Sequence, residues 1–594
     1  MCGIVGLNFT SHHPFEEVLK TLDHRGPDNS AIVKHQNHTF GHTRLAIIDL
    51  HSEANQPMLF DHIIITFNGE IYNYKELIQQ ESLTCQTQSD TEVIIRLYQK
   101  YQTDFLHLLQ GMFAFTLYDT QKERYFCARD RFGKKPFYYY YNQKQFAYAS
   151  EMKALLKLLP SQPELNLSAL ESYLTYQAPI TNLTFFKGLH KLESGCFLTY
   201  DKSGLQHSRY YLLEQKIAKP LSLSKTQALE QLETHLQIAL KRRLVSDTPV
   251  ASFLSGGLDS SLISAMYSQL SGQKIDTFCI GYKEYTHYSE LPFAQRVATH
   301  IGSNHHEVIM RKRDFINNLE RMIETLDEPL ADSACIPTLM LSEAVHQHGI
   351  KVALSGEGSD ECFLGYQPYF DILDIYNQKT IATNSHHTIE GIDLSNAAHY
   401  QERFKHNAPI FGSLGETFMS RHKKLLYKNY TDINHLDIYP HNTMRPDQWL
   451  SFIDYKIWVS EVLMSKIDRM SMVHSLELRA PFLDHELIEF SLRLPPELRI
   501  ANTNKALLKE VALKYLPHDI VHRQKKGFSS PFIEWLYEEY DTQILDTILD
   551  VNKELNLWNS SFIKTLFQEG RKGKFKQHIW TLFIFAKWFK KVYM

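Results

Sequence analysis

The second residue of the chain is a cysteine, and its position could make it a nucleophile. Methionine before a small residue is normally removed, which would leave Cys2 as the first residue. A terminal cysteine carries a thiol and an α-amine with a pKa of about 8 in one residue. The amine can then act as the base for its own thiol. This is a weak signal by itself, because a cysteine at position 2 usually has no catalytic role.

Several downstream segments could complete a site around this cysteine. The segment His24–Asp28 (HRGPD) predicts a tight turn with a buried arginine–aspartate pair. Arg44 opens the apolar run RLAIIDL, and its planar guanidinium can bind a carboxylate through two hydrogen bonds. Asn68 and Gly69 follow the apolar run IIITF, where an amide side chain and a backbone N–H can converge on one oxyanion. Asp90, in the QSD motif, could bind a substrate ammonium group.

The second half of the chain contains a glycine-rich loop, SGGLDSS, at Ser255–Ser261. It lies between a predicted strand and a predicted helix. Its glycines let the backbone approach a pyrophosphate, and its amides and serine hydroxyls can donate to it. Asp259 inside such a loop would repel the anion without a cation, which implies Mg²⁺. The loop lacks the lysine of a Walker A motif, so simple transfer of a γ-phosphate is disfavoured.

A second glycine-rich turn, SGEGSDE, occupies Ser355–Glu361. Its carboxylates, beside two glycines, suit metal binding or acid–base chemistry better than a core. We expect Asp360 to be a second Mg²⁺ ligand and Glu357 to assist attack on an activated carbonyl. Further on, RQKKGF places Lys525 and Lys526 next to a glycine. A lysine there would neutralise charge on a leaving pyrophosphate or a tetrahedral intermediate.

The pattern of apolar residues predicts the elements that position these groups. Residues 1 to about 205 are predicted to be rich in short strands, with helices near Glu16–Leu22 and Thr91–Tyr101. A helix is predicted over Ser224–Leu244, with Ser224 as its N-cap. Strands, glycine-rich turns and helices then alternate, which predicts a parallel sheet with crossover helices. The predicted strands of that sheet are Val250–Leu254, Ile275–Ile280 and Ile350–Leu354, and the chain beyond about residue 366 is predicted to be mostly helical.

Composition restricts the classes of protein that fit. At 594 residues the chain should form two to four domains. The net charge of −4 gives no indication of a nucleic-acid partner. The seven cysteines contain no CxxC pair, which favours the reducing cytoplasm over a disulfide framework. The N-terminus has no secretory pattern, and the apolar run 579–588 is too short for a membrane span, so we expect a cytoplasmic protein with no membrane partner.

The motifs of the first part, taken in order, resemble the class II glutamine amidotransferase domain over about 200 residues. They are MCGI, HRGPD, RLAIID, NGEIYN, QSD, GMFAF and RDRFGKKPFYY. The resemblance implies an α+β fold, an Ntn-type αββα sandwich. It implies that Cys2 attacks the γ-amide of glutamine and that Asn68 and Gly69 stabilise the oxyanion. Arg44 would hold the α-carboxylate, and Glu70 and Asp90 the ammonium. The full glutamine-binding set expected in this way is Arg44, Ile47, Ile48, Asn68, Gly69, Glu70 and Asp90.

The second part resembles the asparagine synthetase domain, an ATP pyrophosphatase of the adenine nucleotide α-hydrolase type. The similar motifs are SGGLDSS, DEPLAD, SGEGSDE, KIDRMSM and LELRAPFLDHEL. The resemblance implies an α/β domain with a parallel sheet and a helical C-terminal part. Its reaction forms an acyl-adenylate, and ammonia then displaces AMP. Lys525 is the expected catalytic lysine, with Glu357 assisting, and Asp259 and Asp360 are the expected metal ligands. The expected ATP contacts are Phe253, Leu254, Ser255, Gly256, Gly257, Asp259, Ser260, Ile280, Ser355 and Gly356.

Together the two resemblances divide the chain into a glutaminase domain at residues 1–205 and a synthetase domain at residues 206–594. They imply that an internal tunnel carries ammonia between the domains. They also imply that the protein binds glutamine, ATP, Mg²⁺ and a carboxylate acceptor. The expected reaction converts L-aspartate to L-asparagine. The oligomeric state is left open, and a homodimer is one of the states considered.

One departure from the pattern leaves the acceptor open. Aspartate-specific synthetases carry an Arg-Ala-Ser segment where this chain reads ADSACIP at 331–337, with Asp332 near the place of the arginine. The alternative acceptor is a uronic acid or a cell-wall or surface-polysaccharide carboxylate. A non-catalytic regulatory paralogue is disfavoured, because the nucleophile, the carboxylates and the lysine are all present.

Overall fold

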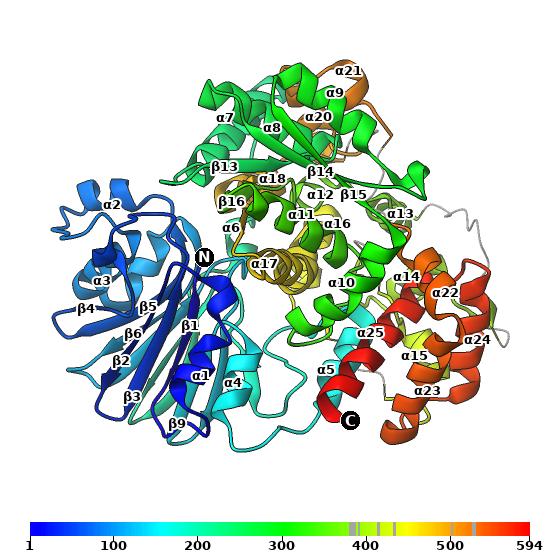
Figure 1. Cartoon of the computed structure of the whole chain (residues 1–594). Helices are drawn as coiled ribbons and strands as arrows, with labels where there is room; N and C mark the ends of the chain where they lie inside the picture. Colours follow the sequence, from blue (N-terminus) through cyan, green and yellow to red (C-terminus); the bar gives the residue numbers. More distant parts are fainter. Residues whose placement is uncertain (379–387, 390–391, 413–415, 432–434, 501–502, 525–529) are drawn as a thin grey trace.

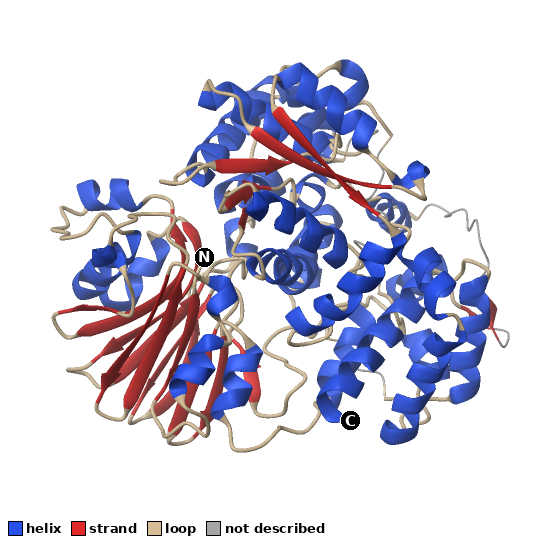
Figure 2. Ribbon diagram, viewed as in Figure 1, coloured by secondary structure: helices blue, strands red, loops and turns tan. Residues whose placement is uncertain are grey.

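Two six-stranded antiparallel sheets form the N-terminal part of the protein (Figures 1 and 2). The computed structural model describes residues 1–378, 388–389, 392–412, 416–431, 435–500, 503–524 and 530–594. The first sheet has the order β10 (Leu189–Lys191), β8 (Tyr138–Asn142), β9 (Gln145–Ala149), β1 (Gly3–Leu7), β3 (His38–Arg44) and β2 (Asn29–His35). The second has the order β12 (Gly204–Arg209), β11 (Cys196–Asp201), β7 (Arg124–Arg129), β6 (Gly111–Asp119), β5 (Ile63–Ile71) and β4 (Met58–Phe60).

Helices cover the outer faces of these two sheets. Helices α1 (Phe15–Lys20) and α4 (Met152–Leu158) pack on the first sheet, and α3 (Asp90–Tyr101), with its neighbour α2 (Tyr74–Gln80), packs on the second. A mainly apolar layer joins the inner faces, because alternate side chains of each strand point inward. It includes Ile4, Phe40, Ile64, Tyr118 and Tyr148. The predicted αββα sandwich is therefore confirmed.

A five-stranded parallel sheet organises the second part. Its order is β15 (Asn304–Met310), β14 (Asp276–Tyr282), β13 (Val250–Phe253), β16 (Val352–Leu354) and β19 (Glu477–Arg479). The sequence predicted β13, β14 and β16 and missed β15 and β19. The chain forms β13, β14 and β15 in order toward one edge of the sheet. It then returns and forms β16 on the opposite side of β13. Ligands bind at such a reversal, outside the carboxyl ends of the strands, and both glycine-rich turns lie there.

The predicted helices that flank this sheet are present. Ser224 caps α7 (Lys225–Arg243) through a reciprocal pair of hydrogen bonds with Gln227, as the sequence predicted. The crossovers and neighbouring segments comprise α6 (Leu213–Lys216), α8 (Leu258–Ser271), α9 (Leu291–Ile301), α10 (Lys312–Thr325), α11 (Cys335–Gln347), α12 (Ser359–Phe363), α18 (His485–Arg493), α19 (Pro496–Arg499), α20 (Ala506–Ala512) and α21 (His518–Val521).

The remaining helices form the predicted helical C-terminal part (Figure 1). They are α13 (Gln367–Tyr376), α14 (Asn396–Lys405), α15 (Ser420–Leu426), α16 (Pro446–Asp454), α17 (Met464–Met472), α22 (Phe532–Tyr540), α23 (Thr542–Leu555), α24 (Ser560–Arg571) and α25 (Lys576–Tyr593), with a small hairpin of β17 (Thr388–Ile389) and β18 (Ile392–Asp393). Helix α5 (Leu167–Tyr176) comes from the first part of the chain and packs against α25 through Tyr173 and Phe585. The apolar run near the C-terminus is a buried helix, α25, as predicted.

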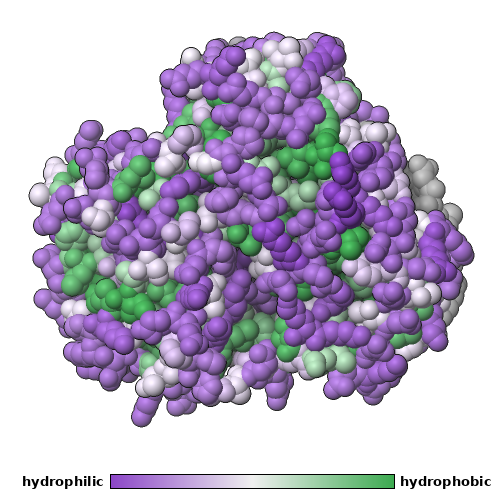
Figure 3. Space-filling view, viewed as in Figure 1, coloured by the Kyte–Doolittle hydropathy of each residue, from purple (hydrophilic) through white to green (hydrophobic). Residues whose placement is uncertain are grey.

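Helix α17 lies between the N-terminal sheets and the parallel sheet (Figure 1). A π-helical segment, Tyr455–Leu463, joins it directly to α16. Seven of its side chains at Lys466–Met472 are buried, so polar groups on α17 must find partners within the protein. The face of the molecule in Figure 3 is largely hydrophilic, with scattered apolar patches. Across the described part of the chain, no helix combines the length and apolarity that crossing a bilayer requires.

Candidate functional sites

The first site forms where the N-terminus meets β5. The Cys2 N–H donates to Asn68 Oδ1 over 3.2 Å. The other half of that amide, Asn68 Nδ2, is buried and has no hydrogen-bond partner among the described residues. A Cβ on Gly69 would lie 2.1 Å from the Met112 carbonyl oxygen, so glycine is required by this close strand pairing. An unpaired amide donor therefore lies next to the cysteine that the sequence singled out.

The Cys2 thiol is buried, and its environment affects its ionisation. Burial raises the pKa of this thiol, while the N-terminal ammonium, the Leu45 N–H and Arg44 act in the opposite direction. Met1 is itself 1% exposed, and its ammonium nitrogen lies 3.7 Å from Glu477 Oε2. Burial lowers the pKa of that ammonium. Met1 thus fills the space between Cys2 and a group of buried carboxylates.

Those carboxylates are unusual because they are crowded together and buried. Burial raises the pKa of Glu70 well above its ordinary value, and Glu477 and Asp90 raise it further. Burial also raises the pKa of Asp90 to about 7, although the Ile71 N–H donates to it over 2.8 Å. Glu70 Oε2 has no hydrogen-bond partner in the described part of the chain. A cluster of this kind favours a bound cation, since a cation relieves the repulsion.

The Arg44 guanidinium already donates hydrogen bonds to oxygen atoms of the protein itself. Its Nη1 donates to the His51 carbonyl oxygen and to Asn55 Oδ1, both over 2.8 Å. Its Nη2 donates to the carbonyl oxygens of Ile48 and Asp49. The guanidinium therefore fixes the loop after β3, where Ile47 and Ile48 are buried. Whether Arg44 also binds the carboxylate of glutamine stays a prediction.

One pairing predicted near Cys2 is wrong. Arg25 and Asp28 of HRGPD do not pair with each other. Asp28 accepts from the Ala46 N–H and pairs with Lys351 Nζ, both over 2.7 Å. Arg25 is buried but binds Asp468 of α17 instead. Both groups thus contact the synthetase part, because the turn lies at the junction of the two parts.

The second site is a pocket with a volume of about 400 Å³ at the carboxyl ends of β13 and β16. Gly256 has φ 72°, and a Cβ there would lie 2.5 Å from the Ala294 nitrogen. A Cβ on Gly356 would lie 2.8 Å from the Ser260 nitrogen, so the two glycine-rich turns touch. The pocket brings together all the predicted ATP contacts except Gly256: Phe253, Leu254, Ser255, Gly257, Asp259, Ser260, Ile280, Ser355 and Gly356.

A lysine that the sequence analysis missed joins the two predicted metal ligands. Lys505 Nζ lies 2.7 Å from Asp259 Oδ2 and 2.6 Å from Asp360 Oδ1. The lysine is buried, and the two carboxylates raise its pKa against the effect of burial. Asp259 also accepts from Ser359 Oγ over 2.7 Å. The two carboxylates can therefore reach one shared cation. Lys505 gave no signal in the sequence because it lies 246 positions from Asp259, in a helical region without a motif.

Lys466 of α17 lies at another side of the same pocket. Its Nζ is 3.0 Å from Asp332 Oδ2 and 3.4 Å from Glu357 Oε1. Asp332 also accepts from the Ala334 N–H over 2.9 Å. Both carboxylates line the pocket, so the departure at Asp332 falls inside the predicted active site. Lys466 belongs to KIDRMSM, a motif of the family resemblance in which no role was predicted for this lysine.

The predicted catalytic lysine, Lys525, and its neighbour Lys526 lie outside the described residues. Arg523 precedes them and lines the pocket. Its Nη1 donates to the Gly256 carbonyl oxygen over 3.2 Å, and its Nη2 lies 2.6 Å from Glu290 Oε1. Among the described residues, no group of three or more His, Cys, Asp or Glu side chains is arranged to hold a metal ion.

Comparisons with known proteins identify the family of each part of the chain. A glutamine amidotransferase domain model matches residues 1–211, and an asparagine synthase model matches residues 231–590. The asparagine synthetase [glutamine-hydrolyzing] 1 of Bacillus subtilis is 30% identical over 99% of this chain and 96% of its own length. A putative asparagine synthetase of Mycobacterium bovis is 31% identical over 96% of this chain and 92% of its own length. The amidase chry2 of Gibberella zeae is 29% identical over 92% of this chain and 90% of its own length.

The two family models define a glutamine amidotransferase domain followed by an asparagine synthase domain, which belongs to a family that uses ATP. The chain belongs to the asparagine synthase family. Amidation with glutamine as the nitrogen donor follows from this membership.

Proposed function

We propose that the protein amidates a carboxylate, with L-aspartate as the favoured acceptor and L-asparagine as the product. Ammonia comes from glutamine hydrolysed at Cys2, and ATP activates the acceptor as an acyl-adenylate with release of pyrophosphate. Ammonia then displaces AMP. The observation that carries this proposal is the pocket itself, where the SGGLDSS and SGEGSDE turns touch at the reversal point of a parallel sheet.

The glycine-rich turn after β13 suits the phosphates of ATP. Helix α8 begins at Leu258, and Gly257, Leu258 and Asp259 line the pocket; helix N-termini attract anions. Ser355 Oγ is buried, lines the pocket and has no partner among the described residues. Phe253, Leu254 and Ile280 add apolar surface, which suits an adenine ring.

Magnesium fits the pair Asp259 and Asp360. Hard cations prefer carboxylate oxygens, and both carboxylates already converge on the Lys505 ammonium. Bound Mg²⁺ would supply positive charge that stabilises the leaving pyrophosphate. Lys505 would share that task with Lys525, while Glu357 would assist attack of ammonia on the activated carbonyl. These roles are inferred from charge and position.

The glutaminase half is inferred from the surroundings of Cys2. Removing Met1 would free an α-amine at the Cys2 nitrogen, which lies 3.2 Å from Asn68 Oδ1. It would also clear the space beside Glu70, Asp90 and Glu477, where the α-ammonium of glutamine can replace the ammonium of Met1. Asn68 Nδ2, which lacks a partner in the described chain, and the Gly69 N–H would then stabilise the oxyanion.

A second acceptor class is kept because of one observation. Asp332 stands near the place of an arginine in aspartate-specific synthetases and is paired with Lys466 inside the pocket. A buried cation held by two carboxylates offers less free positive charge to a second carboxylate of the acceptor. This favours an acceptor with a single carboxylate, such as a uronic acid. Glutamine-dependent amidation of such an acceptor is the alternative.

The test offers L-aspartate and a panel of uronic acids, each with glutamine, ATP and Mg²⁺. Pyrophosphate, AMP and the amidated product are measured for each acceptor. Product from aspartate alone supports the favoured assignment, and product from a uronic acid alone supports the alternative. Formation of ADP and phosphate would overturn the acyl-adenylate route for either acceptor.

A further inference from the structure

Arg25 connects the backbone of Cys2 to the synthetase domain. The Arg25 Nε donates to the Cys2 carbonyl oxygen over 3.1 Å. The two terminal nitrogens donate to the two carboxylate oxygens of Asp468, over 2.8 and 3.0 Å. The guanidinium is fully buried, at 0% exposure. A bidentate arginine–carboxylate pair of this kind fixes the orientation of the guanidinium plane, and with it the direction of the Nε–H bond.

We propose that Asp468 is a positioning residue for the nucleophile Cys2, and that it acts across the domain junction through Arg25. The inference rests on the proposed glutaminase function of Cys2. Asp468 contributes no atom to the substrate site. It holds the arginine whose third N–H fixes the carbonyl of the cysteine, so the synthetase domain completes the glutaminase site.

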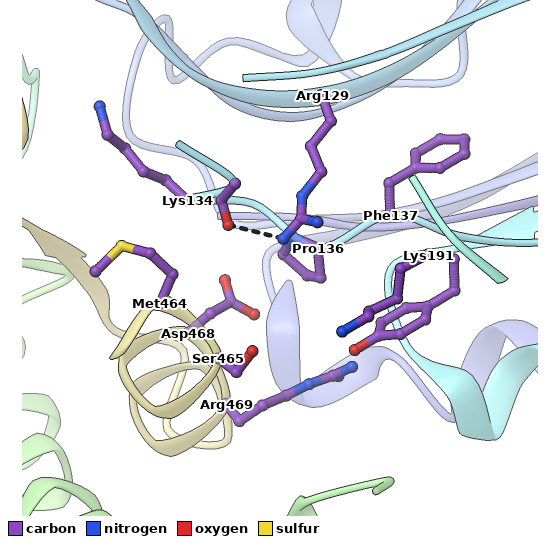
Figure 4. Close-up of a pocket in the computed structure, with 11 residues that line it drawn as sticks. Arg129, Lys134, Pro136, Phe137, Lys191, Met464, Ser465, Asp468 and Arg469 are labelled. Atoms are coloured by element: carbon purple, nitrogen blue, oxygen red, sulfur yellow. Dashed lines mark hydrogen bonds between the residues drawn. The ribbon is translucent and has the colours of Figure 1, made fainter. Parts of the chain in front are cut away.

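The position of Asp468 on α17 gives this contact its significance. Figure 4 shows Asp468 projecting from α17 toward the segment that carries Lys134 and Pro136, while Arg469 extends toward Lys191. Two residues earlier on the same helix, Lys466 contacts Asp332 and Glu357 in the nucleotide pocket. One rigid helix therefore carries a group that orients Cys2 and a group that lines the second site.

Glu151 is a second carboxylate that Arg25 could bind if Asp468 were neutral. Arg25 Nη1 also lies 2.8 Å from Glu151 Oε1, which in turn lies 2.7 Å from Arg469 Nη1. If the carboxylate at position 468 were neutral, the Arg25 guanidinium would turn toward Glu151. Its Nε would then leave the Cys2 carbonyl, because the planar group rotates as a unit. The chain would still fold around a paired arginine, but the nucleophile would be less well oriented.

The test compares two substitutions in the full-length enzyme. Asp468→Asn removes the carboxylate that binds Arg25. Asp327→Asn is the matched control, because Asp327 is a carboxylate of the same ion-pair group that lies 3.3 Å from Arg469 Nη2 and accepts from the Met152 N–H over 2.6 Å. For each variant we measure kcat and KM for glutamine hydrolysis, the rate at which iodoacetamide alkylates Cys2, and amidation with ammonium chloride.

We expect Asp468→Asn to lower the kcat of glutamine hydrolysis by roughly ten- to a hundredfold, the scale of a displaced catalytic group. The KM for glutamine should change by less than about threefold, because the lost interaction orients the nucleophile rather than the substrate. The alkylation rate should change as well, while ammonia-dependent amidation stays near the wild-type rate. Asp327→Asn should leave the kcat of glutamine hydrolysis and the alkylation rate near wild type.

Two results would overturn the inference. One is an equal loss of glutaminase and ammonia-dependent activity in Asp468→Asn, which indicates general damage. The other is an equal effect of the two substitutions on kcat. If Asp468→Asn does not fold, Arg25→Lys carries the test, since a lysine cannot contact Asp468 and the Cys2 carbonyl through a fixed plane. Cys2→Ala separates the two proposals: if it retains glutaminase activity, the proposed role of Cys2 fails, whatever the other variants do.

Discussion

Replacing Lys505 with methionine tests the electrostatics of the nucleotide pocket. At 2.7 Å and an effective dielectric constant of about 20, each lysine–carboxylate pair corresponds to about 6 kcal/mol of gross attraction. Most of this offsets the cost of burying the charges, and breaking a buried pair typically costs about 3–5 kcal/mol. The Asp259 and Asp360 side chains are 22% and 19% exposed. Water can reach them, so we expect Lys505→Met to lower the free energy of unfolding by about 3 kcal/mol.

The same substitution should change catalysis and metal dependence in defined ways. Without Lys505, the neighbouring carboxylates of Asp259 and Asp360 repel each other more strongly, and bound Mg²⁺ would relieve that repulsion. Lys505→Met should therefore unfold at a lower temperature without Mg²⁺ and regain part of the difference when Mg²⁺ is added. Pyrophosphate release should fall roughly a hundredfold, because a charge that stabilises the leaving group is lost.

The assay follows thermal unfolding with and without Mg²⁺, pyrophosphate release with ammonium chloride as the nitrogen source, and glutamine hydrolysis. Lys514→Met is the control, because Lys514 is 55% exposed and pairs with Glu233 near the surface, and such pairs contribute little. Glutamine hydrolysis should remain in both variants. If Lys505→Met releases pyrophosphate at the wild-type rate, the catalytic reasoning is refuted. If Mg²⁺ does not change the unfolding temperature of this variant, the shared cation site is refuted.

Three further predictions concern the two reactions separately. Cys2→Ala should abolish glutamine-dependent amidation and leave ammonia-dependent amidation largely intact, and loss of both would contradict separate sites. Asp90, with a pKa of about 7 raised by burial, becomes charged as the pH rises through that value, so the KM for glutamine should fall as pH rises from about 6 to 8. Asp90→Asn should lose this dependence, and an unchanged profile would exclude Asp90 from binding the ammonium. Lys525→Met should depress adenylation roughly a hundredfold with little change in apparent affinity for ATP, and a larger effect of Lys526→Met would show that the neighbouring lysine is the catalytic one.

Much of the fold was predictable because its signals are local. The Ser224 cap, the alternation of strand and glycine-rich turn, and the apolar run of α25 each involve residues close in sequence. The two missed strands had no such signal. β15 lies at the edge of the sheet with exposed and half-buried positions, so its apolar pattern is weak. β19 has three residues inside a motif, too short for any periodicity to show.

The groups that sequence reasoning missed are those whose partners are distant in sequence. Asp259 and Lys505 are 246 positions apart, and Arg25 and Asp468 are 443 apart. The residues next to a charged side chain in the sequence do not indicate which opposite charge it will pair with in the folded protein. HRGPD suggested the nearest partner, Asp28, and this was wrong because burial at the domain junction supplied a better one. Predicting the residue type of a site is therefore easier than predicting its pairing.

The electrostatics of the glutamine site cannot be assigned to the N-terminal sequence alone. Glu70 and Asp90 come from β5 and α3, yet the groups that shift their pKa include Glu477 and Arg479 of β19. Arg479 Nη2 lies 4.0 Å from Glu70 Oε1, and Glu477 lies beside the terminal ammonium. A free N-terminal half would lose both of these charges together with Asp468. Its carboxylates would then hold a cation less selectively and its cysteine would be oriented less well. We therefore expect the isolated N-terminal part to hydrolyse glutamine less efficiently than the full chain, although the proposed catalytic side chains come from that part alone.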